Sequence, residues 1–225
     1  MGKFFNMDNK FFVFMSRVAD MFILNMVFII CCIPIVTIGA SLTALNYVTL
    51  KMARNEEAYI VRSFFKSFKE NFRQATIIHI IMLAVGILLY LDVMIVGASD
   101  NGLGKVLFCF FIAFTILFAM VYLYIYPVLA RFYNTVKNTF VNSFLMAIRH
   151  LPYTVLMFLI TICPVAIVFI PDVRLQSTIL MLFFLMGFAL VAYVNSRFMV
   201  KVFDNYMPAE ETTAENALPD QEKAV

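Results

Sequence analysis

Charged residues are scarce in this sequence of 225 residues. Asp, Glu, Lys and Arg together make up 14% of the chain, whereas roughly 25% is usual in a soluble domain. Apolar residues reach 63%, and the mean hydropathy is +0.91. A water-soluble domain of this size cannot bury so much apolar surface, so lipid must cover part of it. The composition excludes soluble enzymes, secreted disulfide-rich domains and disordered proteins, and it predicts an integral membrane protein.

Cysteine and histidine are also few, with four Cys and two His in the chain. All four cysteines lie inside apolar runs, where cysteine behaves as a small apolar residue, and none has a partner at metal-ligand spacing: Cys31, Cys32, Cys109 and Cys163. The motifs of zinc proteases, serine hydrolases, phosphate-binding loops and dinucleotide-binding folds are absent. We therefore expect no enzyme activity, no metal site and no cofactor.

Five apolar stretches are long enough to cross about 30 Å of hydrocarbon, which takes about 20 helical residues. They are Val18–Ile38, Ala75–Ala98, Val106–Ala130, Tyr153–Ile170 and Ser177–Ser196. Turn-forming residues separate the second stretch from the third and the fourth from the fifth. The sequence therefore predicts an all-α membrane protein with five full transmembrane helices and two tight antiparallel hairpins.

The stretch Ser41–Ala53 is ambiguous, because its 13 residues span only about 20 Å as a helix. It could continue the first span beyond Pro34, lie in the interface, or return towards the starting side. With five crossings, alternate segments carry 5 and 12 Lys and Arg residues, whereas a returning helix changes the division to 15 and 2. The positive-inside rule favours the sharper division. It predicts six helices and places both termini in the cytoplasm.

Small and hydroxyl-bearing residues are concentrated around the start of this short helix, including Gly39, Ser41 and Thr43. Small residues let helix backbones approach closely in membranes. We interpret this segment as a helix-packing elbow, and the alternative is a loop that contacts a ligand.

Two further segments have the pattern of amphipathic interfacial helices. In Ile60–Arg73, five apolar residues share one face, and four cations form a stripe along its edge: Arg62, Lys66, Lys69 and Arg73. Such a helix can sink its phenylalanines into the interface while its cations reach anionic headgroups. The segment Arg131–Arg149 repeats the plan. We therefore predict contacts with membrane lipids here, and the alternative is a docking surface for a partner protein.

Several polar residues lie within the apolar stretches, where an unpaired polar group is costly. The predicted intramembrane polar set is Asn25, Asn46, Asp92, Arg131 and Asn195. Asp92 and Arg131 belong near opposite ends of their spans, so we do not expect them to form an ion pair. Contacts that hold helices together are the commoner role of such residues, and a polar cavity is the alternative.

The charges are divided unevenly along the chain. Residues 207–225 carry a net charge of −4, whereas the remaining residues carry +7. This division predicts a helical membrane domain at 1–206 and a short acidic disordered tail at 207–225. The basic residues flank apolar spans instead of forming a soluble patch, so no nucleic acid is expected as a partner.

Three segments together resemble the YesL family of bacterial membrane proteins. The first runs from Leu24-Asn25 through Cys32-Ile33-Pro34-Ile35-Val36-Thr37-Ile38-Gly39-Ala40. The second contains Arg54-Asn55-Glu56-Glu57 followed by Ser63-Phe64-Phe65-Lys66-Ser67-Phe68-Lys69-Glu70-Asn71-Phe72. The third is Tyr126-Pro127-Val128-Leu129-Ala130-Arg131-Phe132, leading into Arg149-His150-Leu151-Pro152.

The resemblance covers about residues 4–205 and brings no catalytic residues, because the function of that family is unknown. Genes of the family often lie beside carbohydrate uptake systems and polysaccharide-degrading enzymes. The resemblance therefore implies a protein of the bacterial plasma membrane that is linked to carbohydrate uptake or polysaccharide utilisation. Together with the two basic amphipathic helices, it leads to the hypothesis of a non-enzymatic accessory or scaffold protein. Carbohydrate ABC transporter permeases or a membrane sensor kinase would then be its partners. The alternative is a small autonomous transporter or lipid-handling protein.

Overall fold

The computed structural model describes residues 10–56, 59–98 and 101–206, and this part of the chain forms helices without strands. The elements are α1 (Lys10–Cys31), η1 (Ile35–Thr37), α2 (Ile38–Ala53), α3 (Ile60–Gly97), α4 (Gly102–Arg131), α5 (Val136–Arg149), α6 (Leu151–Ile162), η2 (Cys163–Phe169) and α7 (Val173–Phe203). The predicted all-α membrane fold is confirmed. The predicted acidic tail at 207–225 lies outside the described residues.

Six helical segments in the described chain are long and apolar enough to cross a membrane. One of them is Ile35–Ala53, in which 19 residues of η1 and α2 run together, and half of it is buried, the largest share among the six. Because α2 packs against α1, α3, α4 and α7, it is the centre of the helical core. The short segment of the sequence analysis is therefore a sixth candidate span.

The break between α1 and α2 lies at Pro34, which cannot continue a helix. The helix α1 ends at Cys31, not at Ile38 as the sequence analysis predicted. The Thr37 hydroxyl group donates to the carbonyl oxygens of Cys31 and Pro34 at 2.6 and 2.7 Å. At the other end, the Arg17 guanidinium donates to Asn55 Oδ1 at 2.8 Å. The start of α1 thus adjoins the end of α2, so the short helix does return towards the starting side.

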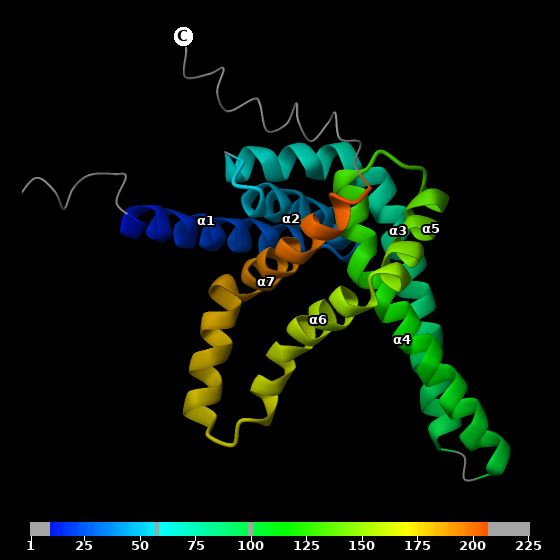
Figure 1. Ribbon diagram of the computed structural model, residues 1–225. Helices are drawn as coiled ribbons and strands as arrows, with labels where there is room; N and C mark the ends of the chain where they lie inside the picture. Colours follow the sequence, from blue (N-terminus) through cyan, green and yellow to red (C-terminus); the bar gives the residue numbers. More distant parts are fainter. Residues whose placement is uncertain (1–9, 57–58, 99–100, 207–225) are drawn as a thin grey trace, which may run out of the picture.

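The predicted interfacial helix Ile60–Arg73 and the predicted span Ala75–Ala98 form one continuous helix, α3. No Pro or Gly separates them, so nothing interrupts the backbone hydrogen bonds. Figure 1 shows the first part of α3 lying along α2 and its second part running beside α4. The predicted division into a cationic part and an apolar part is therefore correct. The predicted boundary between two separate helices is wrong, because α3 continues through it.

Two helical hairpins project from the core in Figure 1. We call residues 83–97 and 102–123 the α3–α4 arm, and residues 158–186 the α6–α7 arm. With the exception of Gly104, no described residue of either arm is buried. In the α6–α7 arm, Pro164 coincides with a change from α-helix to the 3-10 helix η2. The predicted span Tyr153–Ile170 is therefore helical but is not a single α-helix.

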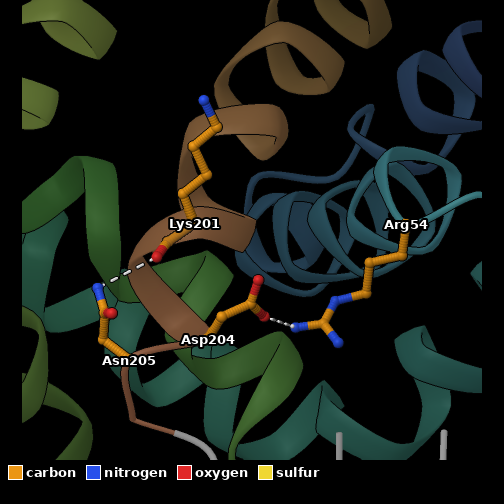
Figure 2. A network of polar contacts seen from close by, with 4 residues as sticks. All are labelled: Arg54, Lys201, Asp204 and Asn205. Atoms are coloured by element: carbon orange, nitrogen blue, oxygen red, sulfur yellow. Dashed lines mark hydrogen bonds and ion pairs between the residues drawn. The ribbon is translucent and has the colours of Figure 1, made fainter. Parts of the chain in front are cut away.

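An ion pair ties the end of α2 to the end of α7. Figure 2 shows the Arg54 guanidinium pointing at the Asp204 carboxylate, with 2.8 Å between the nitrogen and oxygen atoms. The Asp204 side chain is 45% exposed, so we expect a coupling energy of only about 0.5–1 kcal/mol. A double-mutant cycle with Arg54→Ala and Asp204→Ala measures it, and 1 M salt should reduce it. Lys201→Ala is the control, because Lys201 points away from the pair in Figure 2.

Candidate binding groove between the helical arms

Polar side chains join the helices in pairs throughout the interior. Three buried pairs have 2.8–2.9 Å between their polar atoms: Thr49 with Ser196, His79 with Tyr126, and Tyr124 with Thr154. They connect α2 to α7, α3 to α4, and α4 to α6, respectively. A polar group in hydrocarbon needs such a partner, because no water is available there. Most of these residues are hydroxyl-bearing, and the sequence analysis missed them because serine, threonine and tyrosine do not stand out within an apolar run.

Asn25 joins α1 to α7 in an unusual way. Its side chain is fully buried; Nδ2 donates to the Phe184 carbonyl at 2.8 Å, and Oδ1 accepts from the Ala189 amide at 3.0 Å. The asparagine side chain is thus inserted beside the backbone hydrogen-bond ladder of α7, which is a recognised cause of helix bending. Figure 1 shows α7 changing direction between its gold and orange parts. Asn25 therefore positions the α6–α7 arm relative to the core.

A groove of about 500 Å³ lies where the two arms leave the core. Its lining comes from α1, α2, α4, α6, η2 and α7. The lining residues contributed by the α6–α7 arm are apolar except for Thr161, and three of them, Val165, Val168 and Leu180, are exposed. Polar side chains from several elements also line the groove, namely Asn46, Tyr122, Tyr126, Thr161 and Asn195. A mostly apolar cavity with a few converging polar groups is the usual form of a small-molecule site.

Asn195 has one hydrogen-bonding group satisfied and one without a partner. Its Nδ2 donates to Thr161 Oγ1 at 2.9 Å, and the Thr161 hydroxyl in turn donates to the Met157 carbonyl at 2.8 Å. Because that hydroxyl hydrogen is already used, Thr161 can only accept from Asn195, and this fixes the orientation of the amide. Asn195 Oδ1 has no hydrogen-bond partner among the described residues and has almost no accessible surface. This acceptor is therefore enclosed by surrounding protein atoms and is not open to the groove.

The predicted polar set is only partly brought together. Asn46 and Asn195 line the same groove, and the Asn46 amide donates to the Leu42 carbonyl of its own helix at 2.8 Å. Asn25 lies outside the groove, in the contact between α1 and α7.

Asp92 lies near the end of the α3–α4 arm, half-buried, and makes no hydrogen bond or ion pair within the described part of the chain. Arg131 is the last residue of α4. It lines a small polar pocket with Lys66 and Glu70.

The four predicted interfacial cations, Arg62, Lys66, Lys69 and Arg73, are all exposed on α3. Their helix is already held by its apolar face, because Phe64 is fully buried in a cluster with residues of α1 and α2. Burial of Phe64 within the protein corrects the expectation that this whole face enters lipid. Phe65 and Phe72 remain exposed, at 40% and 37%. The cations therefore face outward from a helix whose position does not depend on them.

No group of three or more potential metal-ligating side chains is present among the described residues. The groove and the outward row of cations are the candidate binding surfaces.

Comparison with known proteins gives two matches. Residues 21–93, which cover the second half of α1, all of α2 and most of α3, match a family described as "Protein of unknown function, DUF624". The chain is also 26% identical over 150 residues to "Uncharacterized protein YesL" of Bacillus subtilis (strain 168), covering 66% of this chain and 70% of that protein. No solved structure matches the chain. These matches confirm the resemblance seen in the sequence motifs and support a YesL-like family of unknown function.

Proposed function

We propose that this protein is a non-enzymatic membrane scaffold that docks partner proteins through the first part of α3. The observation that carries the proposal is the row of four exposed cations, Arg62, Lys66, Lys69 and Arg73, on a helix whose buried face holds it firmly in the core. Charged side chains that are not needed to hold their own helix are suited to contacts with other molecules. Anionic membrane lipids and acidic loops of a partner protein are the two chemistries that complement this row.

The link to carbohydrate uptake rests on the resemblance to the YesL family. In this proposal, the partners are permease subunits of a carbohydrate ABC transporter or a membrane sensor kinase. The protein lies in the bacterial plasma membrane with the cation row and both termini on the cytoplasmic side. The ends of the two arms carry few cations: Lys105 lies in the first turn of α4 and Arg174 in the first turn of α7. Connections between helices that have few cations favour the outer side of the membrane.

Charge reversal tests the docking role of the row. The double variant Lys66→Glu and Lys69→Glu should lose co-purifying partner protein by at least tenfold, because each cation near a complementary surface contributes about 1 kcal/mol. Mass spectrometry after purification in a mild detergent measures the recovery. Lys105→Glu with Arg174→Glu is the matched control, because it changes the net charge equally at the arm ends. Equal recovery from both double variants would contradict the proposal.

The groove favours a second candidate function, that of a small autonomous transporter or lipid-handling protein. Of the predicted polar set, only Asn46 and Asn195 line the groove. Substitution of either of these two residues should therefore abolish transport, whereas Asp92→Asn should not. Movement of a fluorescent lipid or a labelled sugar in vesicles containing the purified protein tests this candidate. Absence of movement in wild-type vesicles would exclude it.

A further inference from the structure

The charges at the end of the chain complement the cation row. Residues 207–225, which lie outside the described residues, carry a net charge of −4. The segment Ile60–Arg73 contains the four cations of the row and one acidic residue, Glu70, which leaves it with a net charge of +3. All four cations are exposed, so another segment of the chain can contact them. Because the two segments have opposite charge, they attract each other over roughly 8 Å at physiological salt.

Tyr206, the last described residue, is held against the core. Its hydroxyl oxygen lies 3.2 Å from His150 Nε2, and its backbone amide donates to the Phe203 carbonyl at 2.8 Å. The Arg149 guanidinium lies over the Tyr206 ring, with its carbon atom 5.7 Å from the ring centroid, a distance typical of a cation–π contact. The segment that follows Tyr206 therefore begins at a fixed place on the core.

Two pockets that share Phe132 connect this place with the cation row. Phe132 and Tyr206 both line a pocket of about 510 Å³. Phe132 also lines a second pocket, of about 180 Å³, together with Lys66 of the row. The 19 residues of 207–225 span up to about 60 Å when extended, whereas the row is only about 17 Å long. The segment is therefore long enough to reach every cation in the row.

The second pocket is suited to a carboxylate. Lys66 and Arg131 contribute two positive charges to its lining, and Glu70 contributes one negative charge. The first carboxylates after Tyr206 belong to Glu210 and Glu211. Four or five extended residues cover roughly 13–18 Å, so these two side chains are the first that we expect to contact Lys66.

We propose that the acidic segment 207–225 covers the cation row of its own chain and competes with the partner protein for it. Two observations select this occupant, namely the opposite charge of the segment and its starting point beside the pocket that adjoins Lys66. Contacts between exposed charges are screened by salt, so the cover is reversible, and a more acidic partner displaces it. The competition rests on the proposed docking function, whereas the contact between the segment and the row does not.

Carbodiimide cross-linking of the full chain in mild detergent tests the contact itself. The reagent joins a carboxylate to a lysine amine only where the two groups touch, and mass spectrometry of the digested protein identifies the joined residues. Cross-links from Glu210, Glu211 and Glu215 to Lys66 and Lys69 are the expected result. In 1 M salt their yield should fall at least tenfold, because the Debye length shrinks to about 3 Å.

Lys137 is the internal control for this experiment. It is exposed in the first turn of α5, and α5 contributes to the same pocket as Tyr206. An acidic segment without a preferred position would therefore meet Lys137 as often as it meets the row. Cross-links to Lys137 in equal or greater yield than to Lys66 and Lys69, or no cross-links to these two lysines, would overturn the proposal.

Two matched triple variants test the competition. The first removes three carboxylates: Glu210→Gln, Glu211→Gln and Glu215→Gln. The second introduces the same number of glutamines in the same segment and keeps its charge: Thr212→Gln, Thr213→Gln and Asn216→Gln. Recovery of co-purifying partner protein should rise severalfold in the first variant only, because a competitor within the same chain acts at an effective concentration of about 1 mM.

The two experiments separate this inference from the proposed function. Equal recovery of partner protein from the two triple variants would overturn the competition. Cross-links to the row without recovery of a partner from any variant would contradict the docking function and would still support the contact between 207–225 and the row.

Discussion

Gly39→Ala is expected to lower the free energy of unfolding by about 1–3 kcal/mol or more, the usual cost of overpacking a close-packed interior. Gly39 is buried at the start of α2, where that helix meets α3. A Cβ atom on Gly39 would lie 2.5 Å from the Ala75 carbonyl oxygen and 2.6 Å from His79 Cβ. The first of these is a backbone atom, so it cannot move without displacing α3. A single methyl group must therefore push the two helices apart.

The matched control is Gly86→Ala, which lies in α3 itself. A Cβ there would be 3.4 Å from the Phe118 ring, a distance at which ordinary packing is possible. Since alanine favours helix over glycine by about 0.8–1.0 kcal/mol, Gly86→Ala should be neutral or stabilising. Unfolding by SDS, followed by circular dichroism, compares the two variants. If both substitutions stabilise the protein, the close contact between α2 and α3 is not as the structure shows it.

Asn25→Leu is expected to destabilise the protein by about 1–3 kcal/mol, because two backbone groups of α7 lose their partner. The Phe184 carbonyl and the Ala189 amide both bond to the Asn25 side chain. Without that side chain, these groups can be satisfied only if α7 straightens. Straightening would move the α6–α7 arm, so Asn25→Leu should also weaken binding in the groove, although Asn25 does not line it.

Asn46→Leu is the control for Asn25→Leu. Within the described residues, the Asn46 side-chain amide bonds only to a carbonyl of its own helix. Its loss should therefore change stability by less than about 0.5 kcal/mol, as is usual for a substitution that breaks no contact between helices. Spin labels on the ends of the two arms, at Leu103 and Phe169, measure the distance between the arms. A changed distance in Asn25→Leu but not in Asn46→Leu is the expected result. An unchanged distance and stability in Asn25→Leu would show that Asn25 does not position the arm.

The sequence was sufficient to predict the membrane-spanning segments, because the length of an apolar run of residues depends only on local composition. It also indicated that Ser41–Ala53 returns, because the cation count distinguishes the two arrangements. Helix ends were harder to predict. Four cations in Ile60–Arg73 indicated a separate surface helix, but charge alone does not end a helix, and α3 continues through them.

The contacts between helices could not be predicted from one sequence. Asn25 was identified as an intramembrane polar residue, but nothing in the sequence pairs it with backbone atoms of α7, 159 and 164 residues away. The same holds for the groove, to which Asn46 and Asn195 belong and Asp92 and Arg131 do not. Polar residues in apolar runs can therefore be found from the sequence, whereas their grouping depends on helix packing.

The most direct test of the docking role is photo-cross-linking in intact cells from the cation row itself. A photoreactive phenylalanine analogue at Lys69 should cross-link to a carbohydrate permease subunit or a sensor kinase. The same analogue at Tyr90, which lies on the α3–α4 arm and is 65% exposed, should yield no protein adduct. Lipid adducts alone from position 69, or the same protein adducts from both positions, would contradict the scaffold function.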